Sequence, residues 1–209
     1  MLMSKFKTDQ EEFWSSEFGA EYIERNNSQD LYAANLKFFS TVLASLKGQC
    51  TSILELGANV GMNVGTCKQL LPGVEFTAVE INVSACEQLR LTGCTVIEGS
   101  ILDFVSESKY DLTFTKGVLI HINPSELEGA YTALYDNSKR YILIAEYYSP
   151  TPVAVNYRGH DDRLFKRDFA GELLDRFNDL ELVDYGFCYH RGAFPQDDIT
   201  WFLLEKSNA

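Results

Sequence analysis

The sequence predicts an α/β fold: a doubly wound, mostly parallel seven-stranded sheet that ends in an antiparallel hairpin. Between residues 52 and 145, short apolar runs alternate with segments of helical periodicity, a pattern typical of a parallel sheet covered on both faces. Near the end of the chain, two strand-like runs follow each other, LELVDYGFCYHR and DITWFLLEK. The loop between them is too short for a crossover helix, so we expect them to pair antiparallel.

Local signals mark the individual elements. The capping box TDQE at residues 8–11 predicts a first helix, and a second helix should begin after Ser28 and end near Gly48. Asn123 and Pro124 predict the start of a later helix. The expected strands lie near residues 52–56, 75–79, 95–97, 111–115 and 141–145. The expected helices among and after them lie near residues 62–71, 83–91, 124–136 and 167–177.

Length and composition indicate one domain over residues 1–209. The net charge of −12 disfavours a nucleic acid partner, because such a surface repels phosphate backbones. No apolar run approaches the ~20 residues of a membrane helix, and the first residues lack a signal peptide's apolar stretch. We therefore expect a cytoplasmic protein without a membrane partner. Five scattered cysteines without CxxC, and three histidines without HxxxH, predict reduced thiols and no metal site.

The stretch SILELGANVGMN, residues 52–63, predicts a cofactor loop. An apolar strand carries Glu55 just before a turn that contains Gly57 and Gly61. The dinucleotide fingerprint G-x-G-x-x-G is not met, because Asn59 replaces the middle glycine and the third glycine is missing. A carboxylate before the turn attracts an ammonium group and repels a pyrophosphate. The loop therefore favours S-adenosylmethionine (SAM) over NAD.

A second carboxylate, Glu80, closes the next apolar run, EFTAVE. The end of that strand faces the ribose of an adenosine cofactor, where a carboxylate accepts hydrogen bonds from the ribose hydroxyls. NAD sites use the same device. Glu80 therefore supports an adenosine cofactor without discriminating between SAM and NAD.

With these motifs the chain resembles the class I SAM-dependent methyltransferases. The residues that match the family's first motif are Glu55, Gly57, Asn59 and Gly61, and Glu80 matches its acidic ribose position. The resemblance implies SAM as cofactor, and further cofactor contacts from Ile81, from Ser100 and Ile101 in EGSILDF, and from Lys116 and His121 in YDLTFTKGVLIHI. His121 admits two interpretations, a base or a neighbour of SAM; a structural or cofactor-side role is favoured.

Longer segments resemble a narrower family, the pseudaminic acid biosynthesis-associated methylases. They are FWSSEFGAEYIERN near the start and VNYRGHDDRLFKRDFAGELLDRF and FPQDDITWFLLEK near the end. This resemblance covers almost the whole chain. It implies methyl transfer to a nine-carbon acidic sugar of bacterial flagella or surface polysaccharide, so that the partner is a small-molecule sugar.

Four aromatic residues near the start recur at roughly helical spacing: Phe13, Trp14, Phe18 and Tyr22. Such a stripe is typical of packing, and the alternative is a lid over the cofactor within a helical region at residues 1–47. The resemblance favours a lid at Tyr22 and Arg25. An aromatic ring near a sulfonium would gain cation–π attraction.

The segment Glu146–Asp168 follows the fifth expected strand and should lie where open α/β sheets bind ligands. We expect a long connection of weak regularity, the kind that often carries function. His160 is the candidate general base, with Asp161 or Asp162 to orient it. The alternative is that the charged residues of this segment pair among themselves and hold the loop.

Two neighbours of His160 suit substrate binding. Tyr157 could stack on or hydrogen-bond a polar substrate, and Arg158 could pair with a carboxylate. The first hypothesis is therefore a methyltransferase for an acidic amino sugar. Alternatives are a methyltransferase for a protein such as flagellin, a non-catalytic SAM- or nucleotide-binding regulator, and a dehydrogenase, which the glycine spacing disfavours.

Overall fold

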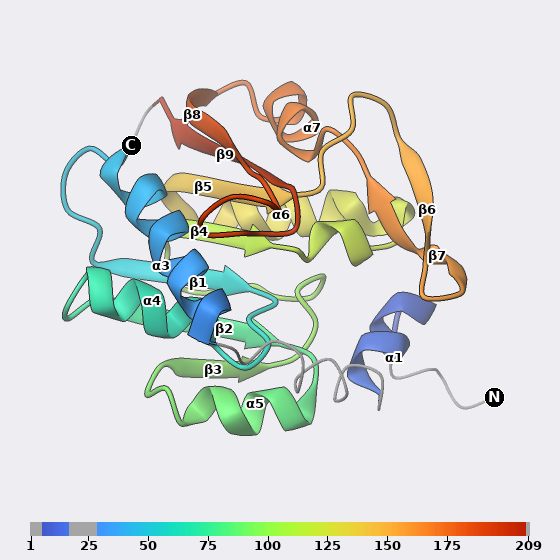
Figure 1. Ribbon diagram of the computed structural model, residues 1–209, viewed down its shortest axis with the longest axis horizontal. Coiled ribbons are helices and arrows are strands. Elements are labelled where there is room, and N and C mark those ends of the chain that lie inside the picture. The colour runs from blue at the N-terminus through green and yellow to red at the C-terminus, as the bar shows by residue number, and fades with distance from the viewer. Residues whose placement is uncertain (1–5, 17–28, 208–209) are drawn as a thin grey trace.

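The computed structural model describes residues 6–16 and 29–207. Its centre is a seven-stranded sheet with the order β3-β2-β1-β4-β5-β9-β8 (Figure 1). Of these seven strands only β9 runs against the rest, because it pairs antiparallel with both β5 and β8. The predicted sheet and C-terminal hairpin are confirmed. The strands are β1 (Ser52–Leu56), β2 (Glu75–Glu80), β3 (Thr95–Glu98), β4 (Tyr110–Lys116), β5 (Ser138–Glu146), β8 (Leu180–Cys188) and β9 (Ile199–Lys206).

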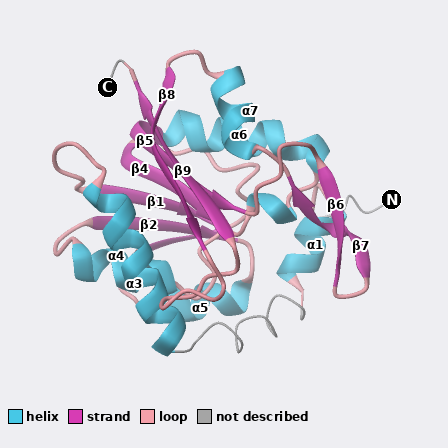
Figure 2. Ribbon diagram, turned by 45° about the horizontal axis from the view of Figure 1, so that its top comes forward, coloured by secondary structure: helices cyan, strands magenta, loops and turns pink. Residues whose placement is uncertain are grey.

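Helices cover both faces of this sheet, as the alternating pattern predicts (Figure 2). Apolar side chains of α3, α4 and α5 pack on one face, and those of α6 and α7 pack on the other. The helices are α1 (Asp9–Ser15), α3 (Gln29–Ala44), α4 (Met62–Leu70), α5 (Val83–Arg90), α6 (Leu127–Asn137) and α7 (Phe169–Arg176), with short 3-10 helices η1 (Leu119–His121) and η2 (Pro124–Glu126).

The N-terminal region divides between the core and the end of the sheet. The predicted capping box begins α1: the Thr8 hydroxyl accepts from the Glu11 amide at 3.1 Å, and the Glu11 carboxylate accepts from the Thr8 amide at 3.1 Å. Helix α3 begins directly after Ser28, as expected, and buries Phe38 and Phe39 against the sheet. Within the predicted lid region, α3 is therefore a core helix and α1 is the part that lies near the cavity described below.

The segment after β5 forms a hairpin instead of the irregular connection that we expected. Strands β6 (Val153–Tyr157) and β7 (His160–Lys166) pair antiparallel. Arg158 and Gly159 make the turn with φ of 52° and 88°, the left-handed values that two-residue hairpin turns require. Figure 1 shows this hairpin and α1 beyond the carboxyl ends of the parallel strands.

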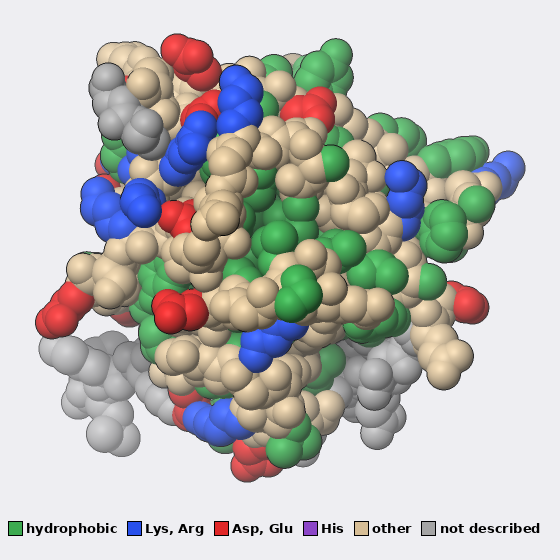
Figure 3. All heavy atoms as spheres, turned by 90° about the vertical axis from the view of Figure 1, so that its left-hand side faces the viewer, with side chains coloured by type: hydrophobic (Ala, Val, Ile, Leu, Met, Phe, Trp, Pro, Cys, Tyr) green, Lys and Arg blue, Asp and Glu red, His purple; other side chains and the backbone are tan. Residues whose placement is uncertain are grey.

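The opposite end of the sheet, where the parallel strands begin, presents a mixture of acidic, basic and apolar side chains (Figure 3). No helix within the described residues is long and apolar enough to cross a membrane.

Candidate functional site

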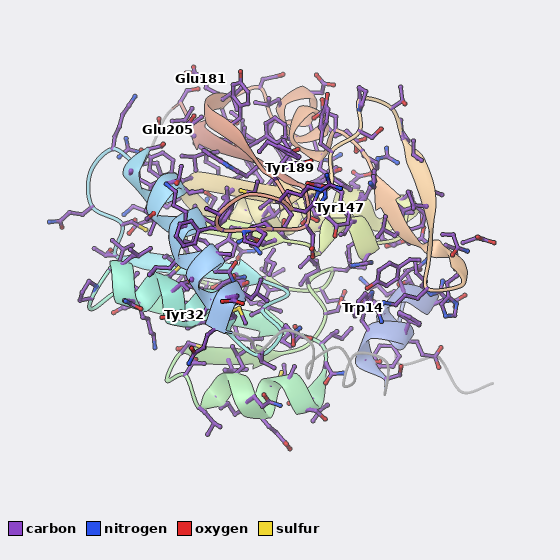
Figure 4. The ribbon with its side chains drawn as sticks, in the orientation of Figure 1. Trp14, Tyr32, Tyr147, Glu181, Tyr189 and Glu205 are labelled. Atoms are coloured by element: carbon purple, nitrogen blue, oxygen red, sulfur yellow. The ribbon has the colours of Figure 1, made fainter. Side chains whose placement is uncertain are left out.

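A cavity of about 560 Å³ lies at the carboxyl ends of β1, β2 and β4. Helix α1, the loop after β1 and the hairpin β6–β7 contribute to its walls. Figure 4 shows Trp14 on α1 and Tyr147 just after β5, both at this end of the sheet. The cavity lies where ligands of open α/β sheets bind, because the loops that follow the parallel strands converge there.

The loop after β1 has three residues with left-handed backbone, Gly57, Asn59 and Gly61, at φ of 83°, 48° and 84°. Asparagine tolerates this conformation better than most side chains, which explains its place where such loops often have glycine. A Cβ atom on Gly57 would lie 2.6 Å from a methyl group of Val118, so the turn after β4 requires glycine here. Gly57 and Asn59 line the cavity.

Gly61 does not line the cavity. It stands at the start of α4, and a Cβ atom there would lie 2.6 Å from Leu89 of α5. Glycine is therefore needed at position 61 so that α4 can pack against α5, and not to let the backbone approach a ligand.

Glu80 lies buried at the end of β2 and lines the cavity. Its two carboxylate oxygens accept hydrogen bonds from the backbone amides of Asn59 at 2.7 Å and Asn82 at 2.8 Å. Burial raises the pKa of Glu80, and these amides oppose the rise. Each oxygen keeps a second lone pair, so the carboxylate is held in place and can still accept from hydroxyl groups of a ligand.

Three buried oxygen acceptors beside the loop have no hydrogen-bond partner among the described residues: Glu55 Oε2, Asn59 Oδ1 and Asn63 Oδ1. Asn59 and Asn63 line the cavity, and Glu55 lies behind them, where its Oε1 accepts from Asn63 Nδ2 at 2.6 Å. Burial raises the pKa of Glu55 to about 8. Unpaired buried acceptors are costly, and an ammonium group offers three donors, so a cationic nitrogen fits this place. A pyrophosphate would bring only further acceptors.

The opposite wall joins the loop after β3 to α1. Ile81, Ser100 and Ile101 line the cavity, and the resemblance implies cofactor contacts from all three. The Ser100 hydroxyl donates to the carboxylate of Glu11, which lines the cavity together with Trp14. The sequence indicated no site role for Glu11, because its part in the capping box already accounted for it. Tyr22 and Arg25, the predicted lid residues, lie outside the described residues, as does Phe18.

His121 lies in the cavity wall at the end of η1, with its ring 4.5 Å from Trp14 and 5.2 Å from Tyr157 between centroids. Its Nδ1 lies 2.6 Å from the carbonyl oxygen of Arg163. A carbonyl only accepts, so Nδ1 carries the proton and Nε2 carries the free lone pair. Burial lowers the pKa of His121 to about 4, which keeps the ring neutral at physiological pH.

The turn that carries His121 is held by Glu146, a buried carboxylate at the end of β5. Glu146 accepts from the backbone amides of Val118 and Leu119, both at 3.0 Å, and of Ile120 at 3.4 Å. Burial raises the pKa of Glu146 to about 7 despite these amides. The carboxylate satisfies amides at the start of η1 that the short helix cannot pair itself.

The hairpin brings only part of the predicted catalytic group to the cavity. Tyr157 and Arg158 line it, with the Arg158 guanidinium 5.6 Å from the centre of the Tyr157 ring. His160 is exposed and does not line it; its ring packs edge-on against Phe13 at 5.2 Å. Asp161 accepts from Asn156 at 2.7 Å and makes no hydrogen bond to His160. These contacts give no support to a His160–Asp161 pair.

Several wall residues come from parts of the chain to which the sequence assigned no site role. Asn35 on α3 accepts from Gln196 Nε2 at 3.0 Å, which ties α3 to the loop before β9. Asp197 of that loop, and Asn82 at the start of α5, also line the cavity. Gln196 and Asp197 lie in FPQDDITWFLLEK, one of the segments that carry the resemblance. That segment assigned them no site role, since only the folded sheet brings this loop to the cavity.

Several solved methyltransferases share this fold at low sequence identity. Magnesium protoporphyrin IX methyltransferase from Synechocystis PCC 6803, with bound S-adenosylhomocysteine (SAH), has a TM-score of 0.70 at 13% identity, over 97% of this chain and 100% of that one. The Burkholderia thailandensis 1,6-didemethyltoxoflavin-N1-methyltransferase, with bound 1,6-didemethyltoxoflavin and SAH, has a TM-score of 0.68 at 14% identity, over 95% of this chain and 87% of that one. A glycopeptide N-methyltransferase with SAM has a TM-score of 0.62 at 16% identity, over 82% and 92%.

No protein-family model and no curated protein sequence matches the chain. The likenesses show that the fold is the Rossmann-like fold of class I SAM-dependent methyltransferases. The narrower pseudaminic acid-associated family is not shown by these comparisons.

Proposed function

We propose that this protein is a SAM-dependent methyltransferase whose acceptor is a small acidic sugar, pseudaminic acid or a related nonulosonate intermediate. The observation that carries the cofactor assignment is the set of unpaired acceptors at Glu55, Asn59 and Asn63, next to the buried carboxylate of Glu80, which accepts from the Asn59 amide. The unpaired acceptors suit an ammonium group, and the Glu80 carboxylate suits ribose hydroxyls. SAM carries both of these groups, whereas NAD does not.

Each group of cavity residues would contact a different part of the cofactor. Glu55, Asn59 and Asn63 would hold the ammonium group of the methionine part, and Glu80 would accept from the ribose hydroxyls. The adenine would lie beside the residues of the opposite wall, Ile81, Ser100 and Ile101. Bound SAM supplies an electrophilic methyl group on a sulfonium centre.

The remaining task of the protein is to align the acceptor and to take up its proton. Alignment alone contributes about 7–11 kcal/mol in well-oriented reactions. Tyr157 and Arg158 line the acceptor's approach, and the neutral His121 offers Nε2 as proton acceptor for a hydroxyl. His121 therefore takes the general-base role that the sequence suggested for His160.

The acidic sugar is supported by the resemblance of the terminal segments and by two cationic side chains in the cavity wall, Lys116 and Arg158. The fold alone leaves the acceptor open, since the solved neighbours are named for acceptors as different as a porphyrin and a glycopeptide.

The cofactor assignment is tested by thermal unfolding with SAM, SAH or NAD. We expect SAM and SAH to raise Tm increasingly with concentration, and NAD to leave it unchanged. Stabilisation by NAD alone would contradict the assignment. Radiolabelled SAM with pseudaminic acid, its biosynthetic intermediates and unmodified flagellin then identifies the acceptor; label in flagellin alone favours the protein acceptor, and SAH binding without labelling favours a regulator.

The pKa of Glu55 gives a sharper prediction. At pH 7 the free site holds a proton on Glu55, because its pKa is raised from 4.5 to about 8. An ammonium group beside the carboxylate favours the charged form and lowers that pKa, so SAH binding should release close to one proton and should strengthen from pH 6 to 8. Calorimetry in two buffers of different ionisation heat at pH 7 measures the release. Equal release by wild type and Glu55→Gln would contradict it; the exposed Glu75→Gln serves as control.

The raised pKa of Glu55 also predicts how the stability of the ligand-free protein depends on pH. Because the folded-state pKa of Glu55 lies above its ordinary value of 4.5, its contribution to the free energy of unfolding is full below about pH 4.5. That contribution is lost as the pH rises through about 8. Glu146, with a pKa of about 7, acts in the same direction.

A further inference from the structure

Part of the cavity wall is built by elements other than the cofactor loop. Leu31 and Asn35 of α3 form one side, and Pro195, Gln196 and Asp197 of the loop before β9 form another. The hydrogen bond between Asn35 and Gln196 joins these two sides. We call this part of the cavity the α3–β9 compartment.

Lys116 is the cation of this compartment. It is the last residue of β4 and lines the cavity, and its ammonium group lies 5.7 Å from the centre of the Phe38 ring on α3. Phe38, like Phe114 two residues before Lys116 on β4, belongs to the core cluster on the α3 face. Alternate residues of a strand share a face, so Lys116 points to this side of the sheet.

Among the residues that the structure describes, none forms a salt bridge or hydrogen bond with the ammonium group of Lys116, which lies over the ring of Phe38. Burial lowers the pKa of Lys116, while the negative charges of Glu55, Asp197 and Glu146 oppose the fall from a distance. Lys116 is partly buried in the cavity wall. A cation withdrawn from water without a paired anion is unfavourable, so an anion that enters the cavity would be attracted to it.

We propose that Lys116 binds the carboxylate of the acceptor and thereby selects acid sugars over their neutral counterparts. The proposal rests on the methyltransferase function proposed above. A carboxylate is the shared chemistry of two ligands, the acceptor and the methionine part of SAM. The acceptor is favoured because Lys116 points into the α3–β9 compartment, whereas the unpaired acceptors that suit the methionine ammonium group lie in the loop after β1.

Three variants separate the two sources: Lys116→Met, which removes the charge at similar length, Lys116→Arg, which keeps it, and Lys37→Met as a matched control. Lys37 lies on the exposed side of α3 and bonds only to that helix. Lys116→Met should remain folded, because it removes a charge that has no paired anion among the described residues. If it proves poorly folded, Lys116→Arg still tests the proposal, because it keeps the charge.

The first arm of the experiment measures the affinity for SAH and for 5′-methylthioadenosine, which has the adenosine and thioether but no amino acid. We expect all three variants to bind both compounds as the wild type does. A loss of SAH affinity in Lys116→Met, with methylthioadenosine unaffected, would assign Lys116 to the cofactor carboxylate and overturn the proposal.

The second arm titrates the SAH complex with pseudaminic acid and with its methyl ester, which lacks the negative charge. We expect wild type and Lys37→Met to bind the acid about 10- to 100-fold more tightly than the ester, as for a hydrogen bond between charged groups. Lys116→Met should lose that preference and Lys116→Arg should keep most of it. No preference for the acid in the wild type, or no binding of it, would overturn the proposal.

The two arms also separate this proposal from the function on which it rests. If the wild type fails to bind SAH, the proposed methyltransferase function fails. If SAH binds normally and the acid binds no more tightly than its ester, the methyltransferase function stands and the role of Lys116 is wrong. If SAH binds normally and the acid does not bind at all, the acidic sugar acceptor is wrong as well.

Discussion

Replacing His121 with alanine is expected to lower turnover by about 10²- to 10⁴-fold at saturating cofactor, the usual contribution of a positioned base. The hydrogen bond from Nδ1 to the Arg163 carbonyl leaves Nε2 as the proton acceptor, and the ring lines the cavity between Trp14 and Tyr157. SAH affinity should stay within about twofold, because no unpaired acceptor of the cofactor loop belongs to this ring.

The pH profile separates a base from a merely structural histidine. Since the pKa of His121 is lowered to about 4, the ring is in its basic form throughout the neutral range. With saturating cofactor we therefore expect the acidic limb of kcat to fall near pH 4 rather than near the ordinary histidine value of about 6.5. This limb should disappear in the residual activity of His121→Gln.

His160→Ala and His190→Ala complete the comparison. His160 is exposed at the end of the hairpin, and His190 bonds to Asp198 outside the cavity. Both variants should turn over at nearly the wild-type rate. A large loss in His160→Ala with none in His121→Ala would return the base to His160 and refute our assignment.

Replacing Glu80 with alanine is expected to weaken SAH binding by about 100-fold or more, since each hydrogen bond to a charged group contributes about 1.5–3 kcal/mol. The carboxylate would lose its bonds to ribose and leave the amides of Asn59 and Asn82 without their acceptor. Isothermal titration measures the affinity, and Tm of the ligand-free variant shows whether it is folded.

Two further variants make the Glu80 result decisive. Glu98→Ala removes a carboxylate from the residue paired with Glu80 on the neighbouring strand β3, where Glu98 is exposed and bonds to Arg90. Glu98→Ala should bind SAH as the wild type does. Glu80→Gln keeps one oxygen acceptor, so its SAH affinity should lie between that of the wild type and that of Glu80→Ala. A folded Glu80→Ala that binds SAH within a few-fold of wild type would show that the ribose lies elsewhere.

The amino-acid sequence determined the elements whose signals are local. Alternating apolar and helical segments predicted the sheet and its order of strands and helices, and the capping box at residues 8–11 predicted the start of α1. The carboxylates at Glu55 and Glu80 were marked by their places at strand ends. The inferences about helices and strands hold because periodicity and capping depend on neighbours within a turn or a strand.

One local signal was missed. In the segment after β5, alternating residues and the pair Arg158-Gly159 mark a hairpin with a two-residue turn, whereas we expected a long connection of weak regularity. His160 was the candidate base within that connection. Once the hairpin forms, its tip carries His160 outward, while Tyr157 and Arg158 still reach the cavity.

Only the tertiary structure decided which side chains share the cavity. Asn35 and Gln196 are 161 positions apart and yet bond to each other, and Trp14 meets His121 because α1 packs at the carboxyl ends of the parallel strands. The tautomer of His121 depends on a carbonyl of β7, and the isolation of Lys116 depends on α3 and the loop before β9. Such contacts arise from packing between distant segments, and local sequence patterns do not contain them.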